Sequence, residues 1–496
     1  MKIKNILILS AALSLGSCSE SFLEINSETD LTTGNYFQTE GDLTAAVNGI
    51  YAALPGIYDN AWMLGEFASD NTYYALNISR GDVEEEEQVA NHQVLRANPN
   101  TAEKFSANYV LIARANQVLV SLESGSFDPN FANPLRGEAL FLRALAYFDL
   151  VQYFGAVPLF TEPAGSFEDT RQPLAEPSEI YSLIISDLNE AGNLLPGKSS
   201  QLPGRATSEA AYTLLGNIHV VREEWSQAEA ALNNVINAPG LGLEENYGNA
   251  FSPSNKNGQE SIFEVQYLEG PLGFASDFTY AWLPVPLSAA TYGALLGVSD
   301  PQEDNNRQTF NIPTKEFIDS FEPGDVRLEY SVDYVQLEPS ANYPENPPVH
   351  PFISKFLHPH ANFGQAGDNW PVYRYAEAKL LMAEALFEQN NGNPAALAHV
   401  NDIRARAGLD PLSSLTKDAI LNERRHELAF ENKRYLDLKR TGRLVPVMTA
   451  MGEAIRANPQ EYYFPPGTTP PPGVLISIIT EYEIPSAEAA LNPNID

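Results

Sequence analysis

The side chains of this 496-residue chain that could bind a ligand are aromatic, amide and carboxylate groups that stand together in polar segments. Indole and phenol rings stack on the flat C–H faces of sugars, while amides and carboxylates hydrogen-bond to hydroxyl groups. These residue types in one place are therefore typical of carbohydrate recognition. The residues that we predict to form a glycan-binding site are Trp62, Asp70, Asn71, Tyr73, Tyr74, Trp282, Asn369 and Trp370.

The four tryptophans of the chain have a second interpretation, as residues of a buried core. Trp225 falls within a predicted pair of helices, and we assign it to the core. Trp62, Trp282 and Trp370 stand in polar or proline-containing surroundings. For these three residues both roles, sugar stacking and core packing, stay open.

The sequence offers little catalytic chemistry. Its seven histidines are scattered, and it contains no HExxH, GxSxG, Walker or GxGxxG motif. His358 and His360 are too few ligands for a metal centre, and segment 300–305 has oxygen ligands without EF-hand spacing. Because the chain has 64 acidic residues, no pair of them singles itself out for glycoside hydrolysis. We predict no catalytic residue, no metal ligand set and no cofactor.

The only cysteine, Cys18, directly follows Leu15-Gly16-Ser17. Two lysines and a short apolar run precede it, which is the pattern of a secretory signal peptide. The run is shorter than the roughly 20 apolar residues that a transmembrane helix needs. Leu-Gly-Ser-Cys resembles the bacterial lipobox, in which the cysteine sulfur receives a diacylglycerol. We predict a signal peptide over 1–17, lipidation of Cys18 and a polar tether over 18–35.

The net charge of −34 excludes one class of partner. Nucleic-acid binding requires a basic surface, and this chain has 64 acidic against 30 basic side chains. A hydrophobic content of 44% is that of a folded globular protein. We therefore expect a folded, acidic protein that does not bind nucleic acid.

Helical periodicity dominates the predicted secondary structure. It begins at Tyr36 and continues up to Pro55. Further helices are predicted over 101–123, 134–154, 178–195, 207–221, 226–238, 371–390, 394–407 and 416–433.

Two helix pairs resemble tetratricopeptide units. In 207–240, Leu215-Gly216 stands where that repeat has its Leu-Gly pair, and Ala228 follows twelve residues after Gly216. A second candidate spans 373–407. Such pairs need neighbours to bury their apolar faces, so we expect them to stack. The predicted fold is mainly α, a tetratricopeptide-like helix-pair scaffold.

The composition changes between about 241 and 370, where Pro, Gly, Asn and aromatic residues accumulate. Residues 260–267 are the best candidate for a strand, and 343–351 is predicted to be a loop. We predict a single domain over 36–496, with helical repeats at about 36–240 and 371–442. The long segment between them is predicted to be an irregular, loop-rich insertion, where binding sites are common.

The chain resembles the SusD/RagB family of surface glycan-binding lipoproteins of Bacteroidetes over nearly its whole length. Eight segments carry the resemblance, in the order of the family. They are the lipobox with SFLE at 21–24, RGEALFLRALAYFDLVQYFGAVPL at 136–159, 181–196, 204–220, 374–386, 401–409, 420–442 and YEIPSAEAALNP at 482–493.

The resemblance implies a surface-exposed, lipid-anchored protein of the outer membrane that has no enzyme activity. It implies capture of an oligo- or polysaccharide and delivery to a SusC-like TonB-dependent transporter. Within 420–442, four residues alternate in charge beside apolar ones, as in an ion-paired helix packed on one face, and we predict that they stabilise the fold and do not bind ligand: Glu423, Arg424, Arg425 and Glu427.

The acidic balance favours a neutral glycan, and a marine β-glucan such as laminarin is our hypothesis for the ligand. Two alternatives stay open: a surface glycoside hydrolase or lyase on a helical scaffold, and a peptide-binding RagB-like lipoprotein.

Overall fold

The computed structural model describes residues 37–75, 84–303 and 309–495. The predicted signal peptide, Cys18 and the tether lie outside the described residues. The structure is mainly helical, with 51% helix and 8% strand, which confirms the predicted fold class. In the part of the chain that it describes, no helix has the length and apolar character needed to cross a membrane.

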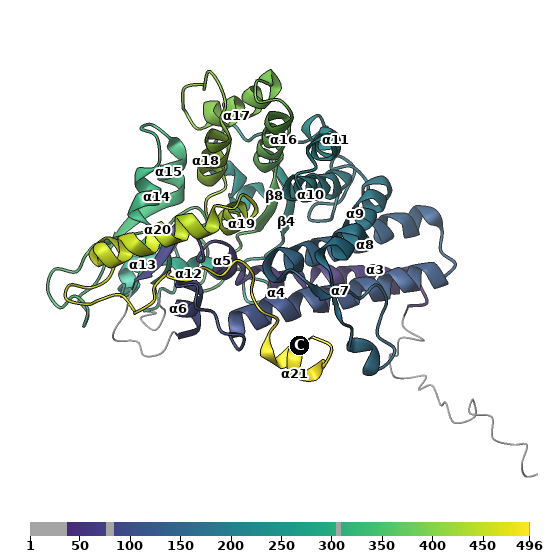
Figure 1. Cartoon of the computed structure of the whole chain (residues 1–496), viewed down its shortest axis with the longest axis horizontal. Helices are drawn as coiled ribbons and strands as arrows, with labels where there is room; N and C mark the ends of the chain where they lie inside the picture. Colours follow the sequence, from purple (N-terminus) through teal and green to yellow (C-terminus); the bar gives the residue numbers. More distant parts are fainter. Residues whose placement is uncertain (1–36, 76–83, 304–308, 496) are drawn as a thin grey trace, which may run out of the picture.

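The N-terminal half is built of helices that pack in sequence order (Figure 1). Their order is α3 (Glu40–Tyr51), α4 (Leu54–Tyr58), α5 (Ala61–Gly65), α6 (Glu84–Ala90), α7 (Pro99–Ser124), α8 (Pro129–Phe154), α9 (Pro177–Leu194), α10 (Ser208–Val221) and α11 (Trp225–Ile236). Helix α8 begins before the predicted residue 134. Asp128 caps its first turn and Pro129 takes the first helical position, so Pro134 lies inside the helix.

The two predicted tetratricopeptide-like pairs are confirmed as pairs of packed helices. Helix α10 packs on α11, and α16 (Tyr375–Gln389) packs on α17 (Pro394–Arg406). Helices α11 and α16 also contact one another, so the two pairs stand side by side at the top of Figure 1. Gly216 permits close approach of α10 to α11, because a Cβ atom there would lie 2.5 Å from Leu232 Cγ. Trp225 is half-buried against the main core.

The insertion contains more regular structure than the sequence predicts. Its strands and helices are β4 (Ser261–Val265), α12 (Phe278–Trp282), α13 (Ala289–Leu296), β5 (Thr309–Pro313), α14 (Lys315–Asp319), α15 (Val326–Ser331), β6 (Val332–Gln336) and β7 (Val349–Ile353), with two short 3-10 helices, η3 (Tyr247–Ala250) and η4 (Pro253–Asn255). The strand predicted at 260–267 is confirmed as β4, whereas the other short elements were not predicted, and loops make up much of the rest of the segment. Each strand finds its partner far along the chain or across a long loop, which local periodicity does not reveal.

Four antiparallel two-stranded sheets join distant parts of the described chain. Strand β4 pairs with β8 (Trp370–Arg374), which ties the two ends of the insertion together. Strand β1 (Thr72–Ala75) pairs with β5, with Thr72 opposite Pro313. Strand β6 pairs with β7, and β2 (Val157–Pro158) pairs with β3 (Leu174–Ala175). A 3-10 turn, η2 (Glu168–Thr170), lies between β2 and β3.

Three boundaries differ from prediction. Residues 370–374 form β8, where we expected the start of a helix, and 349–351 belong to β7, where we expected a loop. Helix α18 (Lys417–Glu427) ends six residues earlier than predicted, because Phe430 and Asn432 adopt positive φ angles of 65° and 62°. After α18 follow α19 (Arg434–Arg440), α20 (Leu444–Ala457), η5 (Pro459–Tyr462) and α21 (Ser486–Leu491).

Four charged residues in the second half of α18 are buried in ion pairs, as predicted for a structural role: Glu423, Arg424, Arg425 and Glu427. Arg327, with no exposed surface, lies 2.6 Å from Glu423 and 3.3 Å from Glu427. Arg374 contacts Glu427 from β8 at 3.1 Å. A buried charge that loses its partner is strongly destabilising. These ion pairs therefore hold α18 against the insertion, through Arg327, and against β8, through Arg374.

Candidate functional site

The structure brings Trp62, Trp282 and Trp370 together, but inside the core. Their exposed fractions are 2%, 0% and 1%. The rings of Trp62 and Trp282 meet edge to face with centroids 6.1 Å apart, and Trp370 lies 6.2 Å from Trp282. Phe356 stacks on Trp370 at 5.5 Å. The geometry thus supports the core interpretation of all three residues. The prediction that they stack on a sugar would require their rings to become exposed.

The polar residues predicted beside Trp62 are buried and already hydrogen-bonded. Asp70 receives two hydrogen bonds from Arg434, at 2.7 and 2.8 Å, and lies 3.0 Å from Arg425. Burial alone would raise the pKa of Asp70, but the two guanidinium groups outweigh it and hold that pKa below its ordinary value. Asn71 donates to Glu66 at 2.7 Å and accepts from Arg425 Nε at 2.7 Å.

The remaining predicted residues also have structural partners. Tyr73 donates its hydroxyl hydrogen bond to Asn91 at 2.7 Å, and its ring lies 4.7 Å from that of Tyr74. Asn369, near Trp370, donates to Glu264 Oε2 at 2.8 Å and accepts from the backbone N–H of Tyr267 at 2.9 Å. Asn369 therefore connects the segments around β4 and β8. None of these groups, as the structure describes them, is positioned at an open surface.

Glu66 is the titratable residue of this segment that sequence reasoning overlooked. It has no exposed surface, and burial raises the pKa of its carboxyl group to about 7, although the hydrogen bond from Asn71 opposes this. In the sequence, the adjacent run Ala68-Ser69-Asp70-Asn71 indicates Asp70 and Asn71 as polar candidates, and nothing local distinguishes Glu66 from a surface glutamate. Only the tertiary structure reveals that the glutamate lies in the core.

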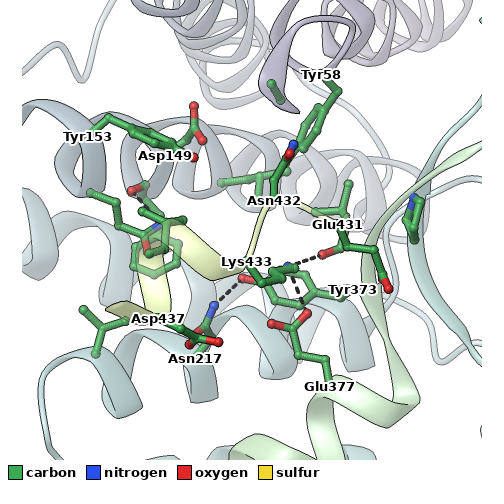
Figure 2. Close-up of a pocket in the computed structure, with 18 of the residues that line it drawn as sticks. Tyr58, Asp149, Tyr153, Asn217, Tyr373, Glu377, Glu431, Asn432, Lys433 and Asp437 are labelled. Carbon is green, nitrogen blue, oxygen red and sulfur yellow. Dashed lines mark hydrogen bonds and ion pairs between the residues drawn. The ribbon is translucent and has the colours of Figure 1, made fainter. Parts of the chain in front are cut away.

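A central pocket lies where α4, α8, α10, β8 and α19 meet (Figure 2). Lys433 donates to the Val372 carbonyl oxygen at 2.8 Å and lies 2.9 Å from Glu377. Asn217 Nδ2 donates to the Tyr373 hydroxyl at 2.9 Å. The aromatic rings of the pocket belong to Tyr58, Phe148, Tyr153, Trp370 and Tyr373.

The charges of this central pocket are paired. Lys104 lies 2.8 Å from Asp149, and Arg424 lies 3.0 Å from Asp437. Burial alone would raise the pKa of Asp437, but Arg424 and Arg440 lower it to about 2. A carboxylate held ionised in this way is a poor general acid or base near neutral pH.

The volume of the central pocket, about 70 Å³, limits what it can hold. A buried water needs roughly 10–15 Å³ on this measure. Small-molecule sites usually occupy about 300–1,000 Å³. The pocket therefore fits a few water molecules but not a sugar ring. Waters there would also reach the amide of Asn432 and Nη1 of Arg424, which have no partner among the described residues.

A second cavity, of about 280 Å³, lies between α7, the segment after β2 and α21. Its walls are mainly apolar and include Tyr109, Phe160, Phe167 and Leu491. Of its polar lining residues, Asn116, Thr170 and Asn492 already donate to backbone carbonyl oxygens.

No group of three or more His, Cys, Asp or Glu side chains in the described part of the chain is arranged to hold a metal ion. His358 Nδ1 lies 2.5 Å from Asp368, and His360 Nε2 lies 2.5 Å from the Tyr280 hydroxyl. Of the candidate cation segment, residues 304 and 305 lie outside the described residues. Asp300 accepts a hydrogen bond from the backbone of Phe363 at 2.7 Å.

Two family models match the chain in separate regions. Residues 21–220 match a model described as "Starch-binding associating with outer membrane", and residues 325–468 match the model of the SusD family. The chain belongs to the SusD family.

Relatives of this SusD-family chain match along nearly its whole length. SusD-like protein P2 of Formosa agariphila is 28% identical and covers 89% of this chain and 91% of its own. A solved "Laminarin binding SusD-like protein" is 25% identical, with a TM-score of 0.72, covering 92% of this chain and 99% of its own. A SusD-like carbohydrate-binding protein of Bacteroides fragilis has a TM-score of 0.74 at 21% identity, covering 93% of this chain and 100% of its own.

Proposed function

We propose that this chain is a non-catalytic glycan-binding lipoprotein of the outer-membrane surface. In this proposal it captures an oligo- or polysaccharide and delivers it to a SusC-like TonB-dependent transporter. The observation that carries the proposal is the likeness, along nearly the whole chain, to a laminarin-binding SusD-like protein. The description of the family model that matches residues 21–220, which names starch binding and the outer membrane, supports it as well.

The electrostatics favour a neutral glycan. The net charge of −34 repels sulfated and uronic polysaccharides within the Debye length, about 8–10 Å at physiological ionic strength. A neutral β-glucan such as laminarin meets no such barrier. The relative that binds laminarin supports the same choice.

The absence of catalysis is a separate part of the proposal. Buried carboxylates of the described residues, such as Asp70, Asp437 and Glu431, are held by arginines. Glycoside hydrolysis requires one carboxyl group that can give up a proton and a second across the scissile bond. Carboxylates held ionised by arginine do not meet the first requirement. Glu66, whose carboxyl pKa is raised to about 7, has no exposed surface from which to reach a glycan.

The proposal is tested on the mature protein with Cys18 replaced by alanine, so that it is handled without detergent. Titration calorimetry measures binding of laminarin, starch, a sulfated glycan and a mixed peptide library, and chromatography follows the glycans for cleavage. We expect binding of at least one neutral glycan without products. Release of shorter saccharides would establish the hydrolase or lyase alternative, and binding of peptides alone would establish the RagB-like alternative.

The transporter partnership has its own measurement. A lid that stays on a transporter needs a permanent interface, which usually buries more than about 2,000 Å². We expect the lipidated protein, purified from native membranes in mild detergent, to bring a TonB-dependent barrel with it. Repeated recovery of the protein without a barrel would contradict this part of the proposal.

A further inference from the structure

An open hollow lies between α14 and η5, on the side of the molecule where Figure 1 shows α14 and the end of α20. Its volume is about 570 Å³, within the roughly 300–1,000 Å³ of small-molecule sites. No residue that the sequence predicted as glycan-binding lines it. The lining residues are Lys315, Glu316, Asp319, Ser320, Glu461 and Tyr462.

One wall of this α14–η5 hollow is Tyr462, whose ring packs against the core side of the hollow. Tyr462 is only 8% exposed, and its ring packs edge to face on Tyr73 with centroids 6.1 Å apart. Burial raises the pKa of Tyr462, and the charges of Glu316 and Glu461 raise it further. The phenol is thus close to two of the three carboxylates of the hollow, Glu316 and Glu461. Within the described residues, the structure shows no hydrogen bond to its hydroxyl group.

A second wall is a carboxylate fixed by the segment beneath it. Glu316 is 59% exposed and accepts two hydrogen bonds from Arg425, at 3.1 and 2.6 Å. Arg425 is in turn held by Asn71 at 2.7 Å and by Asp70 at 3.0 Å. Groups positioned by a buried network of this kind lose little conformational entropy when a ligand binds.

An exposed aromatic ring stands beside the hollow. Tyr334, on β6, is 53% exposed. Burial on its inner side raises the pKa of Tyr334, and the charge of Asp319 raises it further while that of Lys315 lowers it. Lys315 donates to Asp319, and the charges of Glu461 and Tyr334 also act on its ammonium group. Val335, next to Tyr334, pairs with His350, whose ring lies 5.1 Å from that of Tyr463 at the end of η5, so β6 lies close to the hollow.

We propose that the α14–η5 hollow is a subsite for a neutral oligosaccharide, with one sugar ring on Tyr334. Sugar hydroxyls would donate to Glu461 and Glu316, and would accept from Lys315 and the Tyr462 hydroxyl. The three lining carboxylates, offset by Lys315 and by Arg425 beneath, disfavour a sulfated or uronic sugar. This inference rests on the proposed function and names where that function is carried out.

The test compares the binding of a neutral β-glucan oligosaccharide with that of its sulfated derivative by titration calorimetry. Tyr334→Ala should weaken binding of the neutral sugar by about ten-fold or more, by analogy with the loss of other aromatic stacking contacts. Tyr334→Phe keeps the ring and should bind nearly as the parent does. Lys315→Ala, which removes a hydroxyl donor, should weaken binding less. The control, Phe167→Ala, removes a ring that is 57% exposed elsewhere and should change nothing.

Each outcome has a distinct meaning. If the parent binds the neutral sugar and both Tyr334→Ala and Lys315→Ala bind it equally well, the subsite is wrong while the proposed function stands. Tighter binding of the sulfated derivative would also overturn the subsite. If the parent binds no saccharide at all, the proposed function fails and the subsite fails with it. Melting temperatures of all variants should match the parent, because the substituted side chains are exposed.

Discussion

The ring of Tyr73 meets the ring of Tyr462 edge to face, with centroids 6.1 Å apart and 87° between the ring planes. Tyr73 belongs to the segment that the sequence predicts to bind glycan, and Tyr462 lines the α14–η5 hollow. Asn71 and Asp70 of the same segment support the hollow from behind as well, because both contact Arg425, which binds Glu316. The predicted segment thus lies directly behind the proposed subsite and supports its groups.

Trp282→Ala should destabilise the protein without changing the affinity of the folded protein for glycan. Trp282 has no exposed surface, and removing a large buried aromatic side chain costs about 3–5 kcal/mol. Thermal unfolding measures the loss, and calorimetry below the unfolding temperature measures the affinity. Trp225→Ala, at a half-buried ring, should cost less. A large loss of affinity with an unchanged melting temperature would restore Trp282 to the binding site.

The helical part of the fold could be predicted from the sequence because its signals are local. Asn98-Pro99 and Asp128-Pro129, each a capping side chain followed by proline, begin α7 and α8 earlier than the predicted residues 101 and 134, although the periodicity within each helix was predicted. The tetratricopeptide-like pairing depends on Gly216, whose contact with Leu232 lies within the same pair of helices. Residues that are close in sequence determine these features, so they can be predicted from a single sequence.

The candidate site could not be predicted in the same way. Whether Trp282 is exposed depends on Phe278, one turn earlier in α12, and on Phe356 and Trp370, which reach it from two separate segments. The hollow likewise joins α14 to η5, and neither segment carries a local motif. Tyr334 lies in a strand whose partner, β7, was predicted as partly loop. Residue type predicts aromatic and polar chemistry, whereas exposure is a property of the tertiary structure.

Glu66→Gln should stabilise the protein more at pH 8 than at pH 5. The pKa of the Glu66 carboxyl is about 7 in the folded protein against an ordinary value of 4.5. Folding therefore disfavours the ionised form, by about 3 kcal/mol. This cost is fully present above pH 7 and disappears as the pH falls to 4.5. Glutamine never ionises and can still accept the hydrogen bond from Asn71.

The measurement for Glu66 is the difference in melting temperature between variant and parent across pH 5 to 8. That difference should grow as the pH rises. Glu85→Gln, which removes an exposed carboxyl group from α6, is the control and should shift the melting temperature little at any pH. A Glu66→Gln difference that is constant with pH would show that this carboxyl does not titrate in the range.

Gly216→Ala should destabilise the α10–α11 pair. A Cβ atom at this position would lie 2.5 Å from Leu232 Cγ and 2.7 Å from Leu232 Cδ2, so the helices or the leucine must move. Overpacking of this kind costs about 1–3 kcal/mol. Gly49→Ala in α3 is the matched control, since its Cβ would meet nothing within 4 Å. Alanine is the better helix former by about 1 kcal/mol, so this control should stabilise the protein. Equal effects of the two variants on chemical unfolding would contradict the packing argument.

Cys18→Ala should release the protein from the membrane. Cys18 is the only cysteine and directly follows Leu15-Gly16-Ser17, so it is the one residue to which a thioether-linked diacylglycerol could attach. Acyl chains hold a protein on a bilayer by about 0.8 kcal/mol per buried methylene group, and two or more chains give a stable anchor. Without them, no described helix is long and apolar enough to replace the anchor. Membrane fractionation and labelling with a palmitate analogue measure the outcome in the native host, with Ser19→Ala as the control that keeps the thiol. A Cys18→Ala protein that stays in the membrane fraction and still incorporates the label would place the lipid on another residue.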